Sequence, residues 1–234
     1  MDQIKDSIEY GSVVMEYVVE YRARKTLGIG VHPDGSVEIK APMETPLEKI
    51  RQHVLHRAPW ICKQQRYFSS FGIHTPERKY VSGESHLYLG RQYMLRVVDS
   101  ERDEVHYKGN ILEVECRHRE DVRMLLLAWY RKRAEIKLKE YATPLVYRFS
   151  RHQVKPSAIK LKEMETRWGS CTASGQILLN PRLIAAPRIC IEYVIMHELC
   201  HLVYRNHTKA FYELLTREMP DWKKWKMKLE RLMI

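Results

Sequence analysis

The chain has 234 residues, of which 44% are hydrophobic and 29% charged, and its 40 Lys or Arg against 29 Asp or Glu give a net charge of +11. This length can bury a core without disulfides, and the composition excludes a disordered or fibrous protein. Five scattered cysteines without a C-x-x-C pair exclude a disulfide framework and favour a reducing compartment. Because no apolar stretch approaches the roughly 18 residues of a membrane span, we expect a cytoplasmic protein without a membrane partner.

The first half of the chain alternates short β-like runs with turns that contain Gly, Asp or Ser. One helical pattern interrupts them: it begins near Thr45 and Pro46, and it places Leu47, Ile50 and Val54 on one face. The proline at position 59 is expected to kink this helix. We therefore expect residues 1–118 to be mostly β with one helix, with strands at VVMEYVVEY, GIGVH, SVEIKA, HLYLG, YMLRVVD and ILEVEC.

The hydrophobic period changes after the polar stretch 117–121. An i, i+3, i+4, i+7 pattern predicts an amphipathic helix that runs to about residue 141. Its predicted apolar face consists of Val122, Leu125, Leu126, Trp129 and Ile136. We place a domain boundary here, between residues 1–118 and 119–234. Two strand-like runs follow, SAIKLKEME and QILLNP, then a helix from about residue 187 and short helices over 209–218 and 221–232. The expected fold class is α+β.

Positive charge is concentrated on the predicted long helix. Residues 117–151 contain ten Lys or Arg against four Asp or Glu, and the helix carries Arg131, Lys132, Arg133, Lys137 and Lys139. A nucleic acid is one interpretation of the partner, because basic side chains gain free energy by releasing counterions from phosphates. A solvated helix surface is the other, and it explains the same residues.

The motif HELCHLVYRNH, at residues 197–207, points to a metal site. His197 and His201 are four residues apart, so on a helix both imidazoles leave the same face and can reach one ion. Glu198 lies at the flank of that face, where its carboxylate suits a general base acting on a water activated by the metal. The surrounding residues are apolar, which predicts a buried helix.

A catalytic zinc ion needs a third protein ligand. His207 is the preferred candidate, because the helix is expected to end soon after residue 203 and Asn206 tolerates the left-handed backbone that would turn the chain back. Glu213 or Glu218 on the next predicted helix could serve instead. We expect bound Zn²⁺ in either case.

Four segments resemble, in order and spacing, the YgjP-like metallopeptidases, which are relatives of the SprT-type zinc proteases: TRWGSC, ILLNPRLI, YVIMHELCHL and NHTKAFY. The resemblance implies a zincin-like catalytic domain in which His197, His201 and His207 match the zinc ligands and Glu198 matches the catalytic glutamate. It also implies that an extended substrate pairs with an edge strand beside the active-site helix, which we expect to be SAIKLKEMETRW.

The leading hypothesis is a zinc-dependent metallopeptidase that acts on a peptide or protein substrate. One alternative is a metal-dependent hydrolase of a non-peptide substrate such as a nucleoside triphosphate, although the sequence contains no glycine-rich phosphate loop. The other is a nucleic-acid-binding protein with a structural metal. Three ligands beside an intact Glu198 argue against it, since structural zinc sites are usually closed.

Overall fold

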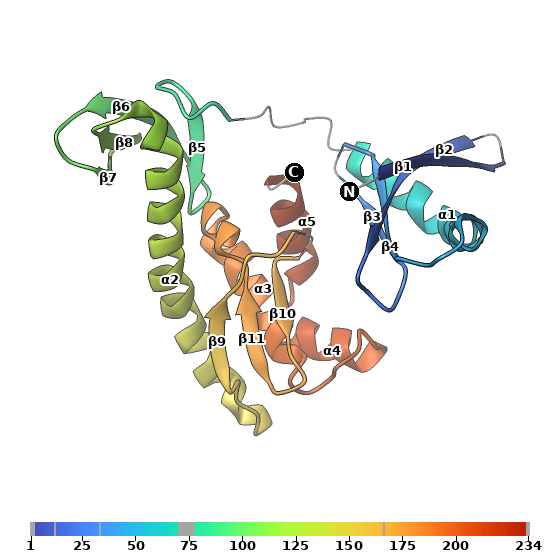
Figure 1. The fold of residues 1–234 in the computed structure, drawn as a ribbon. Helices are drawn as coiled ribbons and strands as arrows, with labels where there is room; N and C mark the ends of the chain where they lie inside the picture. Colours follow the sequence, from blue (N-terminus) through green and yellow to red (C-terminus); the bar gives the residue numbers. More distant parts are fainter. Residues whose placement is uncertain (1–2, 12, 33, 70–77, 166, 233–234) are drawn as a thin grey trace. The chain divides into compact units, whose positions relative to one another are not determined.

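The structure is a computed structural model that describes residues 3–11, 13–32, 34–69, 78–165 and 167–232. Within these residues the fold is mixed α+β, as predicted, with five α-helices and three small sheets (Figure 1). The chain divides into two compact units between residues 76 and 77. None of the described helices is both long and apolar enough to cross a bilayer.

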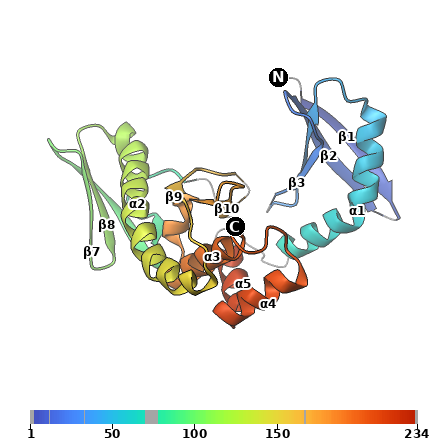
Figure 2. The same cartoon turned by 90° about the horizontal axis from the view of Figure 1, so that it is seen from below.

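The first unit is a four-stranded sheet with one helix on it. Its elements are β1 (Gln3–Tyr10), β2 (Val13–Arg22), β3 (Gly28–Val31), β4 (Val37–Pro42) and α1 (Leu47–Ser69). Alternate residues of β2 and β4 face α1, and their core consists of Met15, Tyr17, Val19, Val37, Ile39, Ala41, Ile50, Val54, Ala58 and Ile61. The helix continues past Pro59 and changes direction along its length (Figure 2), as expected for an internal proline.

The second unit begins with a sheet of the same topology. Its strands are β5 (Ser85–Tyr88), β6 (Arg91–Asp99), β7 (Glu104–Lys108) and β8 (Ile111–Cys116). The strand orders are β1-β2-β4-β3 and β5-β6-β8-β7, and in each sheet a central parallel pair is flanked by two antiparallel pairs. A helix follows each sheet. The amino-acid sequence shows no internal repeat, so the repetition is one of topology.

The long helix α2 (Val122–Phe149) connects this sheet to the C-terminal elements. It runs eight residues beyond the predicted end, through Pro144, and Ile136 of the predicted apolar face is exposed. One hydrophobic cluster joins β5–β8, α2 and the helices that follow, so residues 78–232 share a core. The boundary expected after residue 118 therefore falls inside the second unit, because α2 packs against elements on both sides of it.

The remaining elements form a three-stranded sheet and three helices. They are β9 (Ala158–Leu161), β10 (Gly169–Cys171), β11 (Gln176–Leu179), α3 (Arg188–Cys200), α4 (Lys209–Glu218) and α5 (Trp222–Leu232), with 3₁₀ turns at Arg119–Asp121, Ser150–His152 and Pro181–Ala185. The strand order is β10-β11-β9, with β10 antiparallel and β9 parallel to β11. Both β9 and β10 are therefore edge strands.

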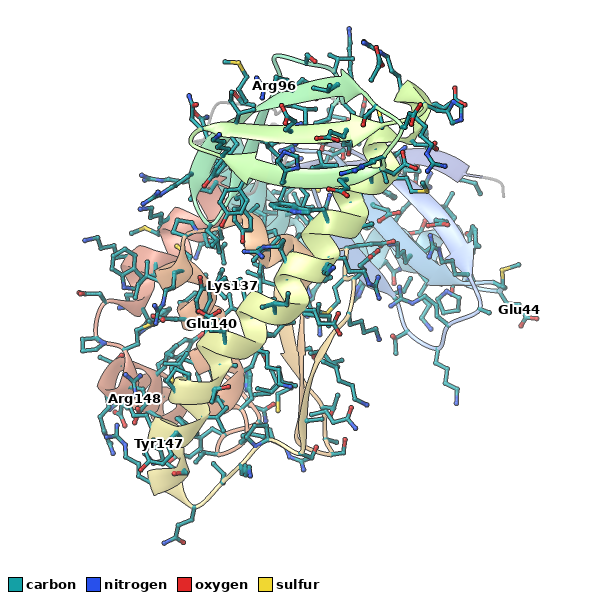
Figure 3. All side chains as sticks on the ribbon, turned by 90° about the vertical axis from the view of Figure 1, so that its left-hand side faces the viewer. Glu44, Arg96, Lys137, Glu140, Tyr147 and Arg148 are labelled. Atoms are coloured by element: carbon teal, nitrogen blue, oxygen red, sulfur yellow. The ribbon has the colours of Figure 1, made fainter. Side chains whose placement is uncertain are left out.

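Several basic side chains of α2 are engaged within the protein. Arg131 forms an ion pair with Glu163 at 3.2 Å. Arg133 donates a hydrogen bond to the Tyr88 hydroxyl at 2.9 Å. Figure 3 shows the helix surface along which Lys137, Glu140, Tyr147 and Arg148 lie, and Lys137 pairs there with Glu140 at 2.7 Å. Nucleic-acid binding through this surface stays a prediction.

The β5–β6 turn joins the sheet β5–β8 to the segment between β11 and α3. Leu89 and Gly90 donate backbone hydrogen bonds of 2.8 and 2.9 Å to the carbonyls of Ile184 and Ala185. Gly90 has a φ of +77°, and a Cβ placed on it would lie 2.5 Å from Pro187 Cγ and 2.8 Å from Pro187 Cα. Only glycine satisfies both the backbone conformation and the close approach.

Gly90→Ala should therefore destabilise the protein more than the same substitution at a glycine that has a similar positive φ but no close neighbour. Gly109 provides the control, because its φ is +61° and nothing lies within 4 Å of a Cβ placed there. We expect Gly109→Ala to lower the free energy of unfolding by ~1 kcal/mol. Gly90→Ala should lower it by about 2 kcal/mol more, since its methyl group also clashes with Pro187. Urea unfolding measures both. Equal losses would show that the contact with Pro187 contributes nothing.

Candidate metal centre

The helix α3 carries the first half of the candidate site and is buried on nearly every side. Nine of its residues are buried, among them Ile191, Ile195 and Leu199. Such a helix cannot be stabilised by an amphipathic pattern, and it forms because neighbouring elements cover it all round. His197 and Glu198 lie in its last turn, and His201 is the residue that caps its C-terminus. The helix thus ends at Cys200, earlier than the expected end soon after residue 203.

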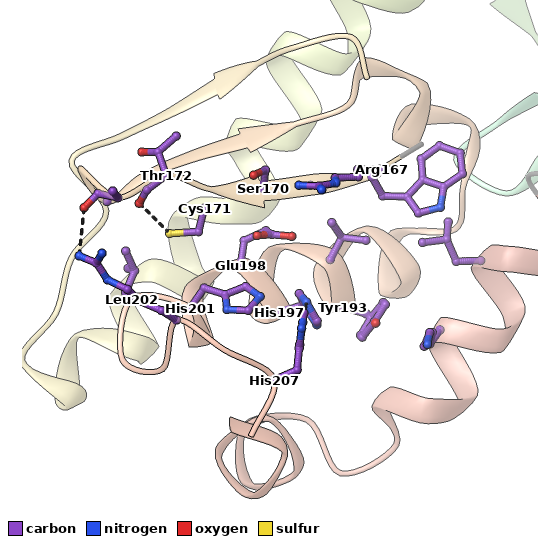
Figure 4. Close-up of a pocket in the computed structure, with 18 of the residues that line it drawn as sticks. Arg167, Ser170, Cys171, Thr172, Tyr193, His197, Glu198, His201, Leu202 and His207 are labelled. Atoms are coloured by element: carbon purple, nitrogen blue, oxygen red, sulfur yellow. Dashed lines mark hydrogen bonds between the residues drawn. The ribbon is translucent and has the colours of Figure 1, made fainter. Parts of the chain in front are cut away.

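Three imidazoles converge at this end of α3. The Nε2 atoms of His197 and His207 are 3.0 Å apart, and the three ring centroids lie 4.7 to 5.0 Å from one another. One ligand atom from each of His197, His201 and His207 falls within 4.8 Å of the others. His201 Nδ1 is 3.0 Å from the Tyr204 carbonyl, so it donates there and its Nε2 is left to bind a ligand. Figure 4 shows the three rings turned toward one another.

The chain reversal that returns His207 to the site differs from the predicted one. Asn206 does not adopt a left-handed conformation. A tight turn follows α3 instead, in which Tyr204 N–H donates to the Cys200 carbonyl at 2.9 Å. Thr208 then caps α4, since its hydroxyl accepts a hydrogen bond from the Phe211 N–H at 3.4 Å. Hydrogen bonds of the turn and the cap therefore place His207, without a strained residue.

The two glutamates considered as alternative ligands lie elsewhere. Glu213 pairs with Lys209 along the surface of α4. Glu218 is buried and pairs with Arg151 at 2.5 Å and with His152 at 2.8 Å. Neither belongs to the histidine cluster or lines the cleft around it. These ion pairs connect the end of α4 to the 3₁₀ turn that follows α2, so Glu218 has a structural role.

The protonation of the cluster suits a cation. Burial, together with the neighbouring His201 and His207, lowers the pKa of His197 to about 3. Burial and His201 also lower the pKa of His207. A lowered pKa favours the neutral imidazole, which is the form that binds a metal. Three imidazoles that face one point leave a position for a further ligand. His197 Nδ1 is buried without a hydrogen-bond partner among the described residues. The donor set fits zinc or a similar borderline cation.

Glu198 is held against β10. Glu198 is 5% exposed. Burial raises the pKa of its carboxyl to about 8, although Arg167 and a hydrogen bond donated by the Cys171 backbone lower this pKa. A Cβ placed on Gly169 would lie 2.6 Å from Glu198 Oε1 and 2.8 Å from its Cγ. The missing side chain of Gly169 therefore lets the strand pass directly over the carboxylate.

A cleft of about 700 Å³ opens around these residues. Its lining includes residues of β10 and the loops that flank it, Trp168 and Tyr193, and Lys226, Leu229 and Glu230 of α5. The strand expected to lie beside the active-site helix was the run 157–168. Its regular part, β9, is instead the far edge of the sheet, and β10 borders the cleft. This prediction was wrong because β11 lies between β9 and β10, so that β10 is the edge strand beside α3.

Asn180 supports the loop before β10 and was missed in the sequence. It is 1% exposed. Its side-chain amide donates hydrogen bonds of 2.8 and 3.0 Å to the carbonyls of Met164 and Arg167, and its Oδ1 accepts one from Arg182 N–H at 3.1 Å. An asparagine between an apolar run and a proline was the available signal, because that position is typical of a helix cap.

Comparison with known proteins identifies the family. A search of curated proteins gives no match. Among solved structures, the metallopeptidase zymogen of Pyrococcus abyssi abylysin is similar at 18% identity with a TM-score of 0.34, covering 40% of this chain and 99% of that one. The family model described as the YgjP-like metallopeptidase domain matches residues 25–232, which is most of the sequence. The chain therefore belongs to the YgjP-like metallopeptidase family.

Proposed function

We propose that this protein is a zinc-dependent metallopeptidase in which His197, His201 and His207 bind the zinc ion and Glu198 is the general base. The observation that carries the proposal is the convergence of three imidazoles beside a buried carboxyl group in one cleft. Membership of the family implies a metal and a peptide or protein substrate. Three histidines are a ligand set typical of catalytic zinc, which keeps its fourth position for water or substrate.

The proposed mechanism combines the metal with the Glu198 carboxylate. When bound, zinc supplies a Lewis acid that polarises the peptide carbonyl and makes a water molecule acidic near neutral pH. Glu198 takes the proton from the attacking water and later delivers it to the leaving amine. Its buried surroundings raise the pKa of the carboxyl, so the carboxylate that accepts the water proton can hold it until it is delivered to the amine.

The edge of β10 offers a binding site for an extended substrate. The backbone groups of Trp168 and Thr172 pair with β11, at Asn180 N–H and the Gln176 carbonyl. Hydrogen bonds alternate in direction along a strand, so the backbone groups of Gly169 and Cys171 point away from β11. The Cys171 backbone donates there to Glu198, and the other groups of this edge can pair with a peptide. A peptide that adds to this edge would lie over Glu198, with main-chain hydrogen bonds as its first contacts.

The first prediction concerns the third ligand. The purified protein should contain about one zinc per chain, and His207→Ala should lose most of it, because two imidazoles bind zinc far more weakly than three. Elemental analysis after dialysis measures the stoichiometry. Glu213→Ala is the control and should keep its zinc. Full zinc in His207→Ala together with loss in Glu213→Ala or Glu218→Ala would assign the third ligand to a glutamate.

The second prediction concerns the base. Glu198→Gln should keep its zinc but lose hydrolysis of a denatured protein substrate by a factor of at least ~10², because the amide has the same shape and cannot accept a proton. Glu192→Gln on the same helix, whose carboxylate pairs with Arg188 at 2.7 Å, should stay within about twofold of the parent. A fully active Glu198→Gln variant would contradict the proposed mechanism.

The third prediction concerns the glycine over the carboxylate. In Gly169→Ala the new methyl group must displace Glu198 or the strand, so kcat should fall ~10-fold or more with zinc content unchanged. Gly30→Ala is the matched strand control, since nothing lies nearer than 3.8 Å to a Cβ placed there. Parent-like kcat in Gly169→Ala would show that the position of Glu198 tolerates this displacement.

A further inference from the structure

We propose that the cleft selects acidic peptides, and that Arg167 and Arg205 recognise carboxylate side chains on the two sides of the scissile bond. The inference rests on the proposed peptidase function and names the class of substrate that the same site takes. Both arginines line the cleft that contains His197, His201, His207 and Glu198. They reach it from separate parts of the chain.

The two arginines reach the cleft from the two ends of β10. Arg167 lies two residues before the strand begins at Gly169. Arg205, in the turn after α3, donates a hydrogen bond of 3.5 Å to the carbonyl of Ala173, two residues after the strand ends at Cys171. Figure 4 shows the Arg167 side chain reaching back along β10 toward Ser170, above Glu198. A peptide added to the edge of β10 would therefore meet Arg167 above Glu198 and Arg205 beyond the C-terminal end of the strand.

Both arginines are available to a ligand. They are exposed, and no ion pair within 4.0 Å involves either of them among the residues that the structure describes. Arg167 is close enough to Glu198 to act on its pKa, yet it does not neutralise that carboxylate by a direct contact. The third cation of the cleft, Lys226, is 3.8 Å from Glu230 on the same helix and is partly compensated. The uncompensated positive charge of the cleft thus lies at the ends of β10.

The spacing of the arginines indicates where a substrate should carry its carboxylates. Residues 167 and 173 are six positions apart, which is at most about 20 Å, because residue 173 lies in the turn after β10. The third residues on either side of a scissile bond are five positions apart, or about 17 Å, and a flexible arginine side chain covers the difference. Guanidinium groups bind carboxylates in a bidentate geometry, which favours Glu or Asp at these two positions.

Two peptide series test the proposal. Fluorogenic peptides of one sequence would carry Glu, Gln or Lys at the third residue on each side of the cleaved bond, and zinc-loaded protein would be assayed for kcat/KM. In parallel, binding of the same uncleaved peptides to zinc-loaded Glu198→Gln would be followed by fluorescence anisotropy. We expect about tenfold higher kcat/KM and affinity for the Glu peptide than for the Gln peptide, the scale of two partly exposed ion pairs, and a smaller preference at 0.5 M salt.

Charge-changing variants assign the effect to the two arginines. Arg167→Gln and Arg205→Gln should each remove about half of the preference on a logarithmic scale, and Arg167→Glu should favour the Lys peptide. Lys132→Gln, an exposed position on α2, is the control and should keep the full preference. Equal binding of the Glu and Gln peptides to Glu198→Gln would overturn the inference. It would also be overturned if a single-stranded oligonucleotide bound more tightly than the Glu peptide and displaced it in a manner that requires these arginines.

The outcomes separate this inference from the proposed function. Hydrolysis of all three peptides without a charge preference would overturn the acidic specificity and leave the peptidase intact. Absence of hydrolysis, with preferential binding of the Glu peptide that the arginine variants abolish, would overturn the peptidase function and support recognition of acidic peptides by the cleft.

Discussion

The burial of α3 is the constraint on which the rest of the second unit depends. A helix that is apolar on nearly every side must be covered on every side, and the same covering removes water from His197 and Glu198. Desolvation is the largest influence on the pKa of both side chains: it lowers the pKa of the His197 imidazole and raises the pKa of the Glu198 carboxyl. The packing that stabilises the fold thus also prepares a metal ligand and a proton carrier.

The polar contacts around α3 hold the other components of the site to this buried helix. The buried Asn180 side chain fixes the loop that leads into β10, and the absence of a side chain at Gly169 lets that strand approach Glu198. On the opposite side, the turn after α3 and the Thr208 cap place His207. The hydrogen bonds of the buried Asn180 side chain are costly to break, so the loop that leads into β10 is held in place before any ligand binds.

The parts of the fold that the sequence predicted well are those whose burial leaves a periodic pattern. The helix α4 was predicted with its observed bounds, because its apolar residues Phe211, Leu214 and Leu215 follow the helical period. The strands β1 and β7 were missed, and both are edge strands with mostly exposed residues, so no alternation marks them. The helix α2 extends past Pro144 because Ala142, Leu145 and Phe149 are buried beyond the predicted end, and packing there outweighs the local preference.

The three histidines and Glu198 could be proposed from their spacing alone, whereas Gly169, Asn180 and β10 needed the tertiary structure, since their roles depend on contacts between distant segments.

The coordination of the metal tests the central claim most directly. X-ray absorption spectroscopy at the zinc edge of the purified protein reports the number and type of the ligand atoms and their distances. The account predicts three imidazole nitrogens at about 2.0–2.1 Å and one further light atom in a four-coordinate site. A sulfur ligand at about 2.3 Å, or a first shell with fewer than three imidazoles, would contradict the assignment of His197, His201 and His207 as the complete set of protein ligands.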